Sequence, residues 1–165
     1  MIKTRDLKLS GFIQALSNTL TQGVLLFADY GYGQREYYHP ERHQGTLTCF
    51  YQHQQHANPF LYLGKQDITA HVNFTEVVTN AVESDCSLLG YTNQSAFLLA
   101  CGLIDLAEKT VKQEITEAWR VNQAIKYLTL PTEMGEYIKV MALSKQLTLP
   151  LLGFSLLDRR RDLII

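Results

Sequence analysis

Two polar side chains follow the most apolar short segment of the sequence. Residues 24–29 read Val-Leu-Leu-Phe-Ala-Asp and lead into Tyr30 and the turn sequence Gly31-Tyr-Gly33. A continuous apolar run of this length indicates a strand buried on both faces, as in a parallel sheet. Ligands of open α/β sheets bind beyond the carboxyl ends of such strands. Asp29 and Tyr30 are therefore candidate catalytic residues, with the alternative that Asp29 only caps the glycine-rich turn.

A second group of polar side chains lies further along the chain. Asp67, Thr69 and His71 alternate along the sequence Asp-Ile-Thr-Ala-His-Val-Asn. Alternate residues of an extended segment point to one side, so these three side chains can share a face. A carboxylate and an imidazole on one face can bind a basic substrate and accept a proton. The alternative is that Asp67 and Thr69 satisfy local backbone N–H groups.

Four of the five histidines lie close together in the sequence, which invites a metal hypothesis. His39 and His43 are four residues apart, and His53 and His56 are three apart. Zinc sites usually combine such pairs with cysteine or carboxylate ligands on defined elements. The local sequence indicates loop and strand instead, and Pro40 interrupts the first pair. We therefore expect these histidines to line a cleft or face solvent, and we expect no metal.

The elements that position these residues can be predicted from hydrophobic periodicity. Apolar residues from Leu7 to Leu20 recur at the period of an amphipathic helix, and Gly23 suits the position just past its end. Residues 34–74 lack this periodicity and carry four of the nine tyrosines. Two strands are expected there, at residues 46–52 and 60–63. Long insertions after a core strand are usually lids or binding loops, so we interpret 34–74 as an inserted lid that binds substrate.

The remaining segments complete an α/β pattern. Asn73 and Glu76 have the spacing of an N-terminal capping box, which predicts a helix at residues 74–83. Further helices are expected at 95–101 and 105–128, and further strands at 86–91, 137–145 and 151–156. This order of helices and strands predicts a single α/β domain over residues 1–165.

Composition excludes several classes of protein. The 165 residues are 46% hydrophobic and 19% charged, with a formal net charge of −1, which is ordinary for a folded domain. This balance gives no general attraction to nucleic acid or to anionic membranes. The sequence has no apolar run long enough to span a bilayer. Its three cysteines, without Cys-x-x-Cys spacing, fit buried thiols in a reducing cytoplasm.

Several motifs in fixed order resemble one protein family. They are Asp29-Tyr-Gly-Tyr, Tyr37-Tyr-His-Pro-Glu-Arg, Gly45-Thr-Leu, Tyr51-x-His53, Gly64-x-x-Asp67-Ile-Thr-Ala-His-Val-Asn-Phe-Thr, Thr92-x-Gln94-x-x-Phe97-Leu and Met134-Gly-Glu-x-x-Lys-Val-Met-Ala-Leu. From about residue 9 to its end the chain resembles the MidA-like S-adenosyl-L-methionine-dependent methyltransferases. Mitochondrial members of that family are complex I assembly factors that methylate a protein arginine. The sequence Arg42-His-Gln-Gly45 departs slightly, because the family usually has Arg followed directly by Gly or by a short Gly-rich stretch.

The resemblance also indicates what this sequence lacks. The family's fold is a class I, Rossmann-like sheet, in which a glycine-rich cofactor loop follows the first strand. No strand followed by Gly-x-Gly-x-x-Gly occurs here. The resemblance therefore implies the C-terminal half of such an enzyme, with the fifth, sixth and seventh strands at 24–29, 86–91 and 137–145. It implies S-adenosyl-L-methionine for the parent family and no cofactor bound by this chain alone.

The same comparison predicts an association surface. In the family's sheet the fifth strand pairs with the fourth on one side and with the seventh on the other. Without the fourth strand, residues 24–29 present an unpaired apolar edge, and their faces lack covering helices. Such edges associate. We expect this strand to pair with a second copy of the chain or with a separate N-terminal half.

Three hypotheses for function follow. In the first, the chain supplies the substrate side of a protein arginine methyltransferase and is inactive in isolation, with Asp29 and Tyr30 as catalytic residues and Asp67, His71 and Arg42 as substrate-binding residues. The cofactor-binding residues stay unknown. The second is a non-catalytic remnant or interaction module that dimerises or complements an N-terminal half. The third, ranked last, is a small metal-binding or hydrolytic domain, for which no Gly-x-Ser-x-Gly motif is present.

Overall fold

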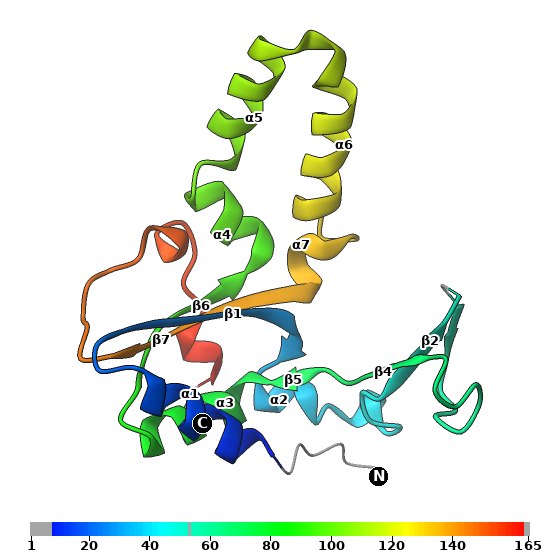
Figure 1. The fold of residues 1–165 in the computed structure, drawn as a ribbon, viewed down its shortest axis with the longest axis vertical. Coiled ribbons are helices and arrows are strands. Elements are labelled where there is room, and N and C mark those ends of the chain that lie inside the picture. The colour runs from blue at the N-terminus through cyan, green and yellow to red at the C-terminus, as the bar shows by residue number, and fades with distance from the viewer. Residues whose placement is uncertain (1–7, 53, 164–165) are drawn as a thin grey trace.

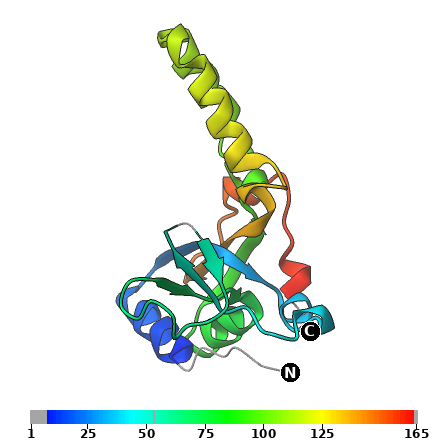
Figure 2. The same cartoon turned by 90° about the vertical axis from the view of Figure 1, so that its right-hand side faces the viewer.

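The computed structural model of the chain describes residues 8–52 and 54–163. It has three parts: a body built on a four-stranded mixed sheet, a small three-stranded sheet beside the body, and a helical hairpin (Figure 1). The hairpin projects away from the body and stands clear of the small sheet (Figure 2). The architecture is α/β, as expected. No helix among the described residues combines the length and the apolarity needed to cross a membrane.

The main sheet is organised around one antiparallel ladder. Its strand order is β5-β1-β7-β6, with β5 at Val72–Asn73, β1 at Gly23–Tyr32, β7 at Ile138–Lys145 and β6 at Ser87–Asn93. β1 and β7 pair from Gly23 opposite Lys145 to Tyr30 opposite Ile138. β6 pairs with the other edge of β7, also antiparallel. The adjacency of β1 and β7 expected from the family's strand order is thus confirmed.

The opposite edge of β1 is mostly open. β5 pairs with β1 in parallel only at Gly31 and Tyr32. Within the described part of the chain, residues 23–30 have no strand on that edge. The backbone N–H and C=O groups that point outward there are available to another strand.

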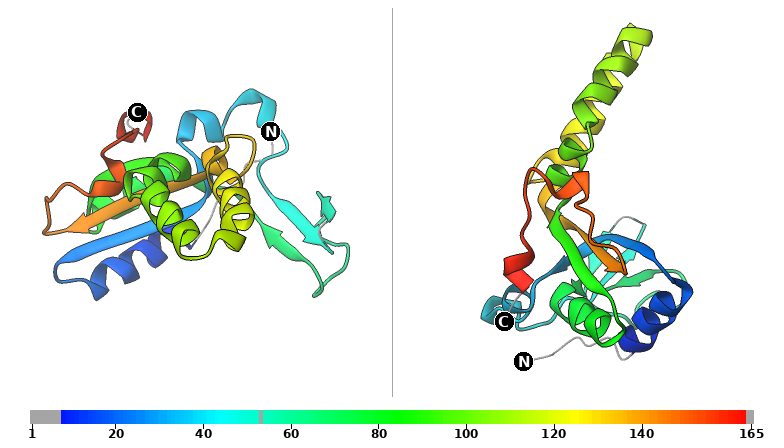
Figure 3. Two further views of the ribbon diagram at one scale, coloured as in Figure 1. Left: turned by 90° about the horizontal axis from the view of Figure 1, so that it is seen from above. Right: turned by 90° about the vertical axis from the view of Figure 1, so that its left-hand side faces the viewer.

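Two helices cover one face of the sheet. α1 (Leu9–Thr19) and α3 (Phe74–Glu83) lie together below it, as the right-hand view of Figure 3 shows. Their apolar stripes and the sheet form the main core, which is made of Ile13, Phe74, Val77, Ala81, Cys86, Tyr91, Met141, Leu143 and Leu163. α3 begins where it was predicted, because the Asn73 side chain accepts a hydrogen bond from the Glu76 N–H at 3.4 Å.

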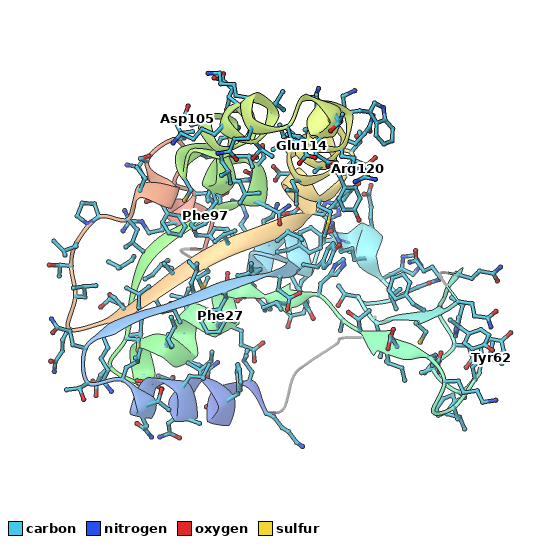
Figure 4. All side chains as sticks on the ribbon, turned by 45° about the horizontal axis from the view of Figure 1, so that its top comes forward. Phe27, Tyr62, Phe97, Asp105, Glu114 and Arg120 are labelled. Atoms are coloured by element: carbon cyan, nitrogen blue, oxygen red, sulfur yellow. The ribbon has the colours of Figure 1, made fainter. Side chains whose placement is uncertain are left out.

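Shorter elements cover part of the other face. They are α4 (Gln94–Ala100), α7 (Met134–Tyr137) and the 3-10 helix η3 (Leu152–Phe154). Val140, Ala142 and Phe154 form a second, smaller core there, against which Phe97 packs edge-on, with ring centroids 5.4 Å apart. Figure 4 shows Phe27 and Phe97 on opposite sides of the sheet.

The small sheet has the strand order β3-β2-β4. Its strands are β2 at Thr48–Tyr51, β3 at Gln54–His56 and β4 at Asp67–Thr69. Two short helices lead into it from β1, α2 at Gln34–Tyr37 and η1 at Pro40–Arg42. β2 confirms the strand predicted at residues 46–52. A last 3-10 helix, η4 (Arg160–Leu163), returns the end of the chain to the body.

The prediction of one long helix at residues 105–128 was wrong. Two helices, α5 (Leu103–Gln113) and α6 (Ala118–Thr129), are joined by the 3-10 turn η2 (Ile115–Glu117). Helix α5 ends at Gln113, because the backbone of the next residue, Glu114, is extended at φ −145° and ψ 93°. The reversal lets apolar residues of α6 lie beside those of α5, whereas one straight helix would leave both groups in water.

Two further segments are not the strands that were predicted. Residues 60–63 form a turn, in which the Asn58 side chain accepts the Phe60 N–H at 3.0 Å and Tyr62 has a φ of +51°. Asn followed by Pro favours such a turn over a strand. Residues 151–156 include η3, because Phe154 turns inward against Phe97 instead of extending beside β6.

Residues 24–29 are a strand, but they are not buried on both faces. None of the six is fully buried, and Leu26 is 54% exposed. Leu25 and Phe27 pack on the main core, whereas no described element covers Leu26 on the other face. The expected exposure of this strand is therefore confined to one face and one edge.

The close packing of β6 against Phe154 can be tested with glycine substitutions. A Cβ at Gly90 would fall inside the Phe154 ring, so Gly90→Ala should lower the free energy of unfolding by about 1–3 kcal/mol. The matched control is Gly11→Ala in α1, where a Cβ meets no atom within 4 Å. That control should raise stability by about 0.5–1 kcal/mol. Urea denaturation measures both; an unchanged midpoint for Gly90→Ala would contradict this packing.

Candidate functional site

An aromatic cavity lies at the carboxyl end of β1. The small sheet faces this end of the strand across a space of about 500 Å³. Its lining residues are Tyr30, Tyr32, Thr46, Thr48, Phe50, Gln55, Thr69, His71 and Tyr137. β6 runs in the same direction as β1, so the cavity occupies the end of the sheet at which α/β proteins bind ligands. We call it the aromatic cavity below.

The strand geometry explains why two tyrosines line this cavity. Tyr30 and Tyr32 are two residues apart on β1 and therefore point to the same side. Gly31 lies between them, where a Cβ would collide with the Val72 carbonyl oxygen and the Phe74 ring. The glycine thus allows β5 to approach β1, and this contact places His71, the residue before β5, beside the tyrosines.

His71 is the central polar group of the cavity. Its ring stacks on Tyr30, with centroids 6.3 Å apart, and meets Tyr32 edge-on at 5.1 Å. Its Nδ1 atom is buried and has no hydrogen-bond partner among the described residues. Desolvation by burial lowers the pKa of His71, and the positive charge of Arg42 lowers it further, although the Asp29 carboxylate opposes both. The imidazole is therefore neutral at neutral pH.

Arg42 packs against the same aromatic group. Its guanidinium carbon lies 4.0 Å from the centroid of Tyr32. The guanidinium also donates a hydrogen bond of 2.9 Å to the Glu36 carbonyl oxygen and lies 3.9 Å from the Glu36 carboxylate. Arg42 does not line the cavity but supports the Tyr32 ring that does. Tyr32 thus packs with a guanidinium, an arrangement stabilised by cation–π attraction.

The two candidate aspartates occupy different positions. Asp29 is exposed, and its Oδ1 accepts the Tyr30 N–H at 2.7 Å, which is the local role considered as the alternative. Its carboxylate is still close enough to His71 to affect the pKa of the imidazole. Asp67 is exposed on β4 opposite Phe50 and does not line the cavity, whereas Thr69 on the same strand does.

Most of the cavity wall was missed in the sequence. Thr48 and Phe50 alternate on β2, and Tyr137 comes immediately before β7. The alternation of Tyr30 with Tyr32, and of Thr48 with Phe50, was a usable signal for shared faces. No local signal in the sequence shows that the two sheets face each other, because that arrangement depends on contacts between segments far apart in the chain.

A charged cluster lies at the same end of the sheet. The Glu136 carboxylate accepts hydrogen bonds from Lys139 at 2.7 Å, from Arg159 at 2.8 Å and from Asn93. Burial alone would raise the pKa of Glu136, but the hydrogen bonds from Lys139, Asn93 and Arg159 together lower it. Beside the cluster, burial raises the pKa of Tyr91. These charged groups already form hydrogen bonds with one another, and the bonds hold α7 against the ends of β6 and β7.

The glycines at the end of β1 do not form an open cradle for a cofactor. The space beside Gly31 is filled by Val72 and Phe74, and a Cβ at Gly33 would lie 2.9 Å from the Asp162 carbonyl oxygen. The described residues therefore do not fit the glycine-rich loop that holds S-adenosyl-L-methionine. Within residues 8–52 and 54–163, no three His, Cys, Asp or Glu side chains are grouped so that they could hold a metal ion. His53, one of the clustered histidines, lies outside the described residues.

The pKa of His71 gives a direct test of the cavity's electrostatics. NMR titration should give a value below 6.5, raised by Arg42→Gln and lowered further by Asp29→Asn. The unfolded chain takes up this proton near pH 6.5, whereas the folded chain takes it up only at a lower pH. His71 therefore lowers the stability of the fold as the pH falls below about 6.5. A measured value above 6.5, or substitution effects of opposite sign, would contradict the arrangement.

Comparison with known proteins shows the family to which the chain belongs. Residues 6–92 match the family described as "Putative S-adenosyl-L-methionine-dependent methyltransferase". A crystal structure of a COG1565 superfamily member from Burkholderia thailandensis, bound to S-adenosyl-homocysteine, is 38% identical with a TM-score of 0.88. This chain matches it over 92% of its own length and 39% of that protein's.

A second crystal structure, of an uncharacterized COG1565 superfamily protein from the same organism, is also 38% identical, with a TM-score of 0.90. The match covers 96% of this chain and 42% of the other. No curated protein matches the sequence. The chain thus spans about two fifths of the length of these solved relatives. Because the family match extends over more than half of its residues, the chain belongs to this family of S-adenosyl-L-methionine-dependent methyltransferases.

Proposed function

We propose that this chain forms the methyl-acceptor side of a methyltransferase that acts on protein arginine. The observation that carries the proposal is the aromatic cavity with the neutral His71 in its wall. S-adenosyl-L-methionine supplies the methyl group in this family. Because the described residues do not fit that cofactor, we assign to this chain only the binding of the acceptor and the handling of its proton.

The cavity walls suit a guanidinium group. Tyr30, Tyr32, Phe50 and Tyr137 supply aromatic faces in a space of about 500 Å³. Aromatic faces attract cations, most strongly where water is excluded, and Arg42 already makes such a contact with Tyr32. The charge of Arg42 is offset by the neighbouring Glu36 carboxylate. The Asp29 carboxylate near the cavity adds the negative charge that a substrate arginine requires.

His71 is the proposed proton acceptor. A protonated arginine must lose one proton for its nitrogen to become a nucleophile. The lowered pKa of His71 keeps its imidazole in the free-base form at neutral pH, and its Nδ1 lacks a partner among the described residues. Asp29 can then stabilise the imidazolium that forms. Tyr30 orients the imidazole by stacking on it, and Asp67 stays a candidate for contacts with the substrate polypeptide outside the cavity.

The role of Asp29 can be tested in an intact enzyme that contains this sequence. Asp29→Asn should lower the methylation rate roughly tenfold to a hundredfold, because charged hydrogen bonds contribute about 1.5–3 kcal/mol. Binding of S-adenosyl-L-methionine should change little. Glu83→Gln, at an exposed carboxylate at the end of α3, is the matched control. An unchanged rate in Asp29→Asn would exclude a part for this carboxylate in the reaction.

The open edge of β1 supports a second candidate function. Residues 23–30 expose strand backbone, and Leu26 exposes an apolar side chain beside it. A chain that catalyses nothing could use this edge to pair with a second copy or with a separate N-terminal half. In the acceptor-side proposal, the same edge would join the half that holds the cofactor.

Calorimetric titration of the chain with S-adenosyl-L-methionine tests both ideas. Because the glycines at the end of β1 are closed by Val72, Phe74 and Asp162, we expect no measurable heat from the chain alone. Heat should appear only after an N-terminal half is added, if the chain is part of an enzyme. Saturable binding by the chain alone would exclude the non-catalytic remnant and would show a cofactor site that the glycine geometry does not predict.

A further inference from the structure

The hairpin of α5 and α6 is poorly covered by the rest of the described chain. Figures 1 and 2 show it extending from the body with no other element beside it over most of its length. Neither helix contributes a buried residue, and Trp119 on α6 is 70% exposed. Figure 4 shows Asp105, Glu114 and Arg120 on this hairpin, far from Tyr62 in the turn between β3 and β4.

An apolar groove runs between the two helices. It has a volume of about 510 Å³ and is lined by Ile104, Ala107, Glu108, Val111, Lys112, Ala118, Val121, Asn122 and Ile125. Helices of 11 and 12 residues are marginal in water by themselves and depend on packing of their apolar faces. The two helices cover each other on one side only, so the groove requires a further layer.

The charges of α5 indicate what that layer is. The first half of the helix carries the acids Asp105 and Glu108, and the second half carries the bases Lys109 and Lys112. All four side chains are exposed, and the one ion pair recorded among them, Lys112 with Glu108 at 3.7 Å, lies at the solvent-exposed surface of the same helix, where such pairs contribute little. A second α5 in antiparallel orientation places acids opposite bases, whereas a parallel copy places like charges together. A two-fold axis perpendicular to the helix produces the antiparallel arrangement.

We propose that the hairpin pairs with the hairpin of a second copy of this chain, with the two α5 helices antiparallel. The four helices then form a bundle whose core includes Ile104, Val111, Val121 and Ile125. The interface uses side chains of the hairpin and leaves the β1 edge free, so it is separate from the strand pairing proposed above. It also does not depend on the acceptor-side function.

Trp119 provides a reporter for this interface. It is the chain's only tryptophan, and it lies at the rim of the groove, next to the lining residue Ala118. On dilution of the wild-type chain, its emission should move to longer wavelength as the bundle dissociates. The double variant Asp105→Lys/Glu108→Lys makes α5 basic, and Lys109→Glu/Lys112→Glu makes it acidic. Each variant alone should raise the dissociation constant roughly tenfold or more, and a mixture of the two should restore association.

Two controls keep the test specific. Leu26→Lys changes the exposed side of β1 and should leave the Trp119 transition where it is in the wild-type chain. Zero-length carboxylate–amine cross-linking of mixed ¹⁴N and ¹⁵N wild-type chains, read by mass spectrometry, should join Asp105 or Glu108 of one copy to Lys109 or Lys112 of the other. This measurement needs no variant to fold. The proposal would be overturned if the Trp119 emission did not depend on concentration. It would also be overturned if both charge variants associated as the wild type does, or if every cross-link joined residues of a single isotope.

Discussion

The structure depends on the antiparallel ladder between β1 and β7. Eight residues of β1 pair in register with β7, from Gly23 opposite Lys145 to Tyr30 opposite Ile138. Residues 138–144 of β7 are all buried, so this strand contributes side chains to both cores, one on each face of the sheet. A one-residue slip would exchange the two faces of β7 and move Met141 and Leu143 out of the main core. The positions of the cavity tyrosines on β1 follow from the same register.

The buried side chain of Lys139 on β7 fixes the structure at the cavity end of this ladder. The residue is 5% exposed, and its ammonium group donates to both the carbonyl and the carboxylate of Glu136. A buried cation without its partner would be strongly destabilising. Glu136 on α7 must therefore stay beside Lys139, and this fixes the position of α7 and of Tyr137, which lines the cavity. Arg159 joins the same carboxylate and holds the end of the chain nearby.

Local signals in the sequence were sufficient for elements whose ends are set by nearby residues. α3 was predicted with its correct bounds because Asn73 and the apolar period both specify it. The hairpin was not predicted, because its deciding contacts are between α5 and α6. The turn at residues 60–63 did have a local signal, Asn58 followed by Pro59, which the strand prediction overlooked. In the site, Tyr30 and His71 were selected from the sequence, whereas Phe50 and Tyr137 come from segments brought together only by folding.

The open edge of β1 and the hairpin of α5 and α6 would bind a partner through different groups. The edge of β1 offers backbone groups from residues 23–30, and any strand of suitable length can pair with them. Specificity there must come from side chains such as Leu26 on the exposed face. The hairpin offers only side chains, because its backbone groups are used within its own helices, and its charges distinguish one orientation of a partner helix from the other. Since the two surfaces use separate parts of the chain, occupation of one leaves the other free, and a protein could use both at once.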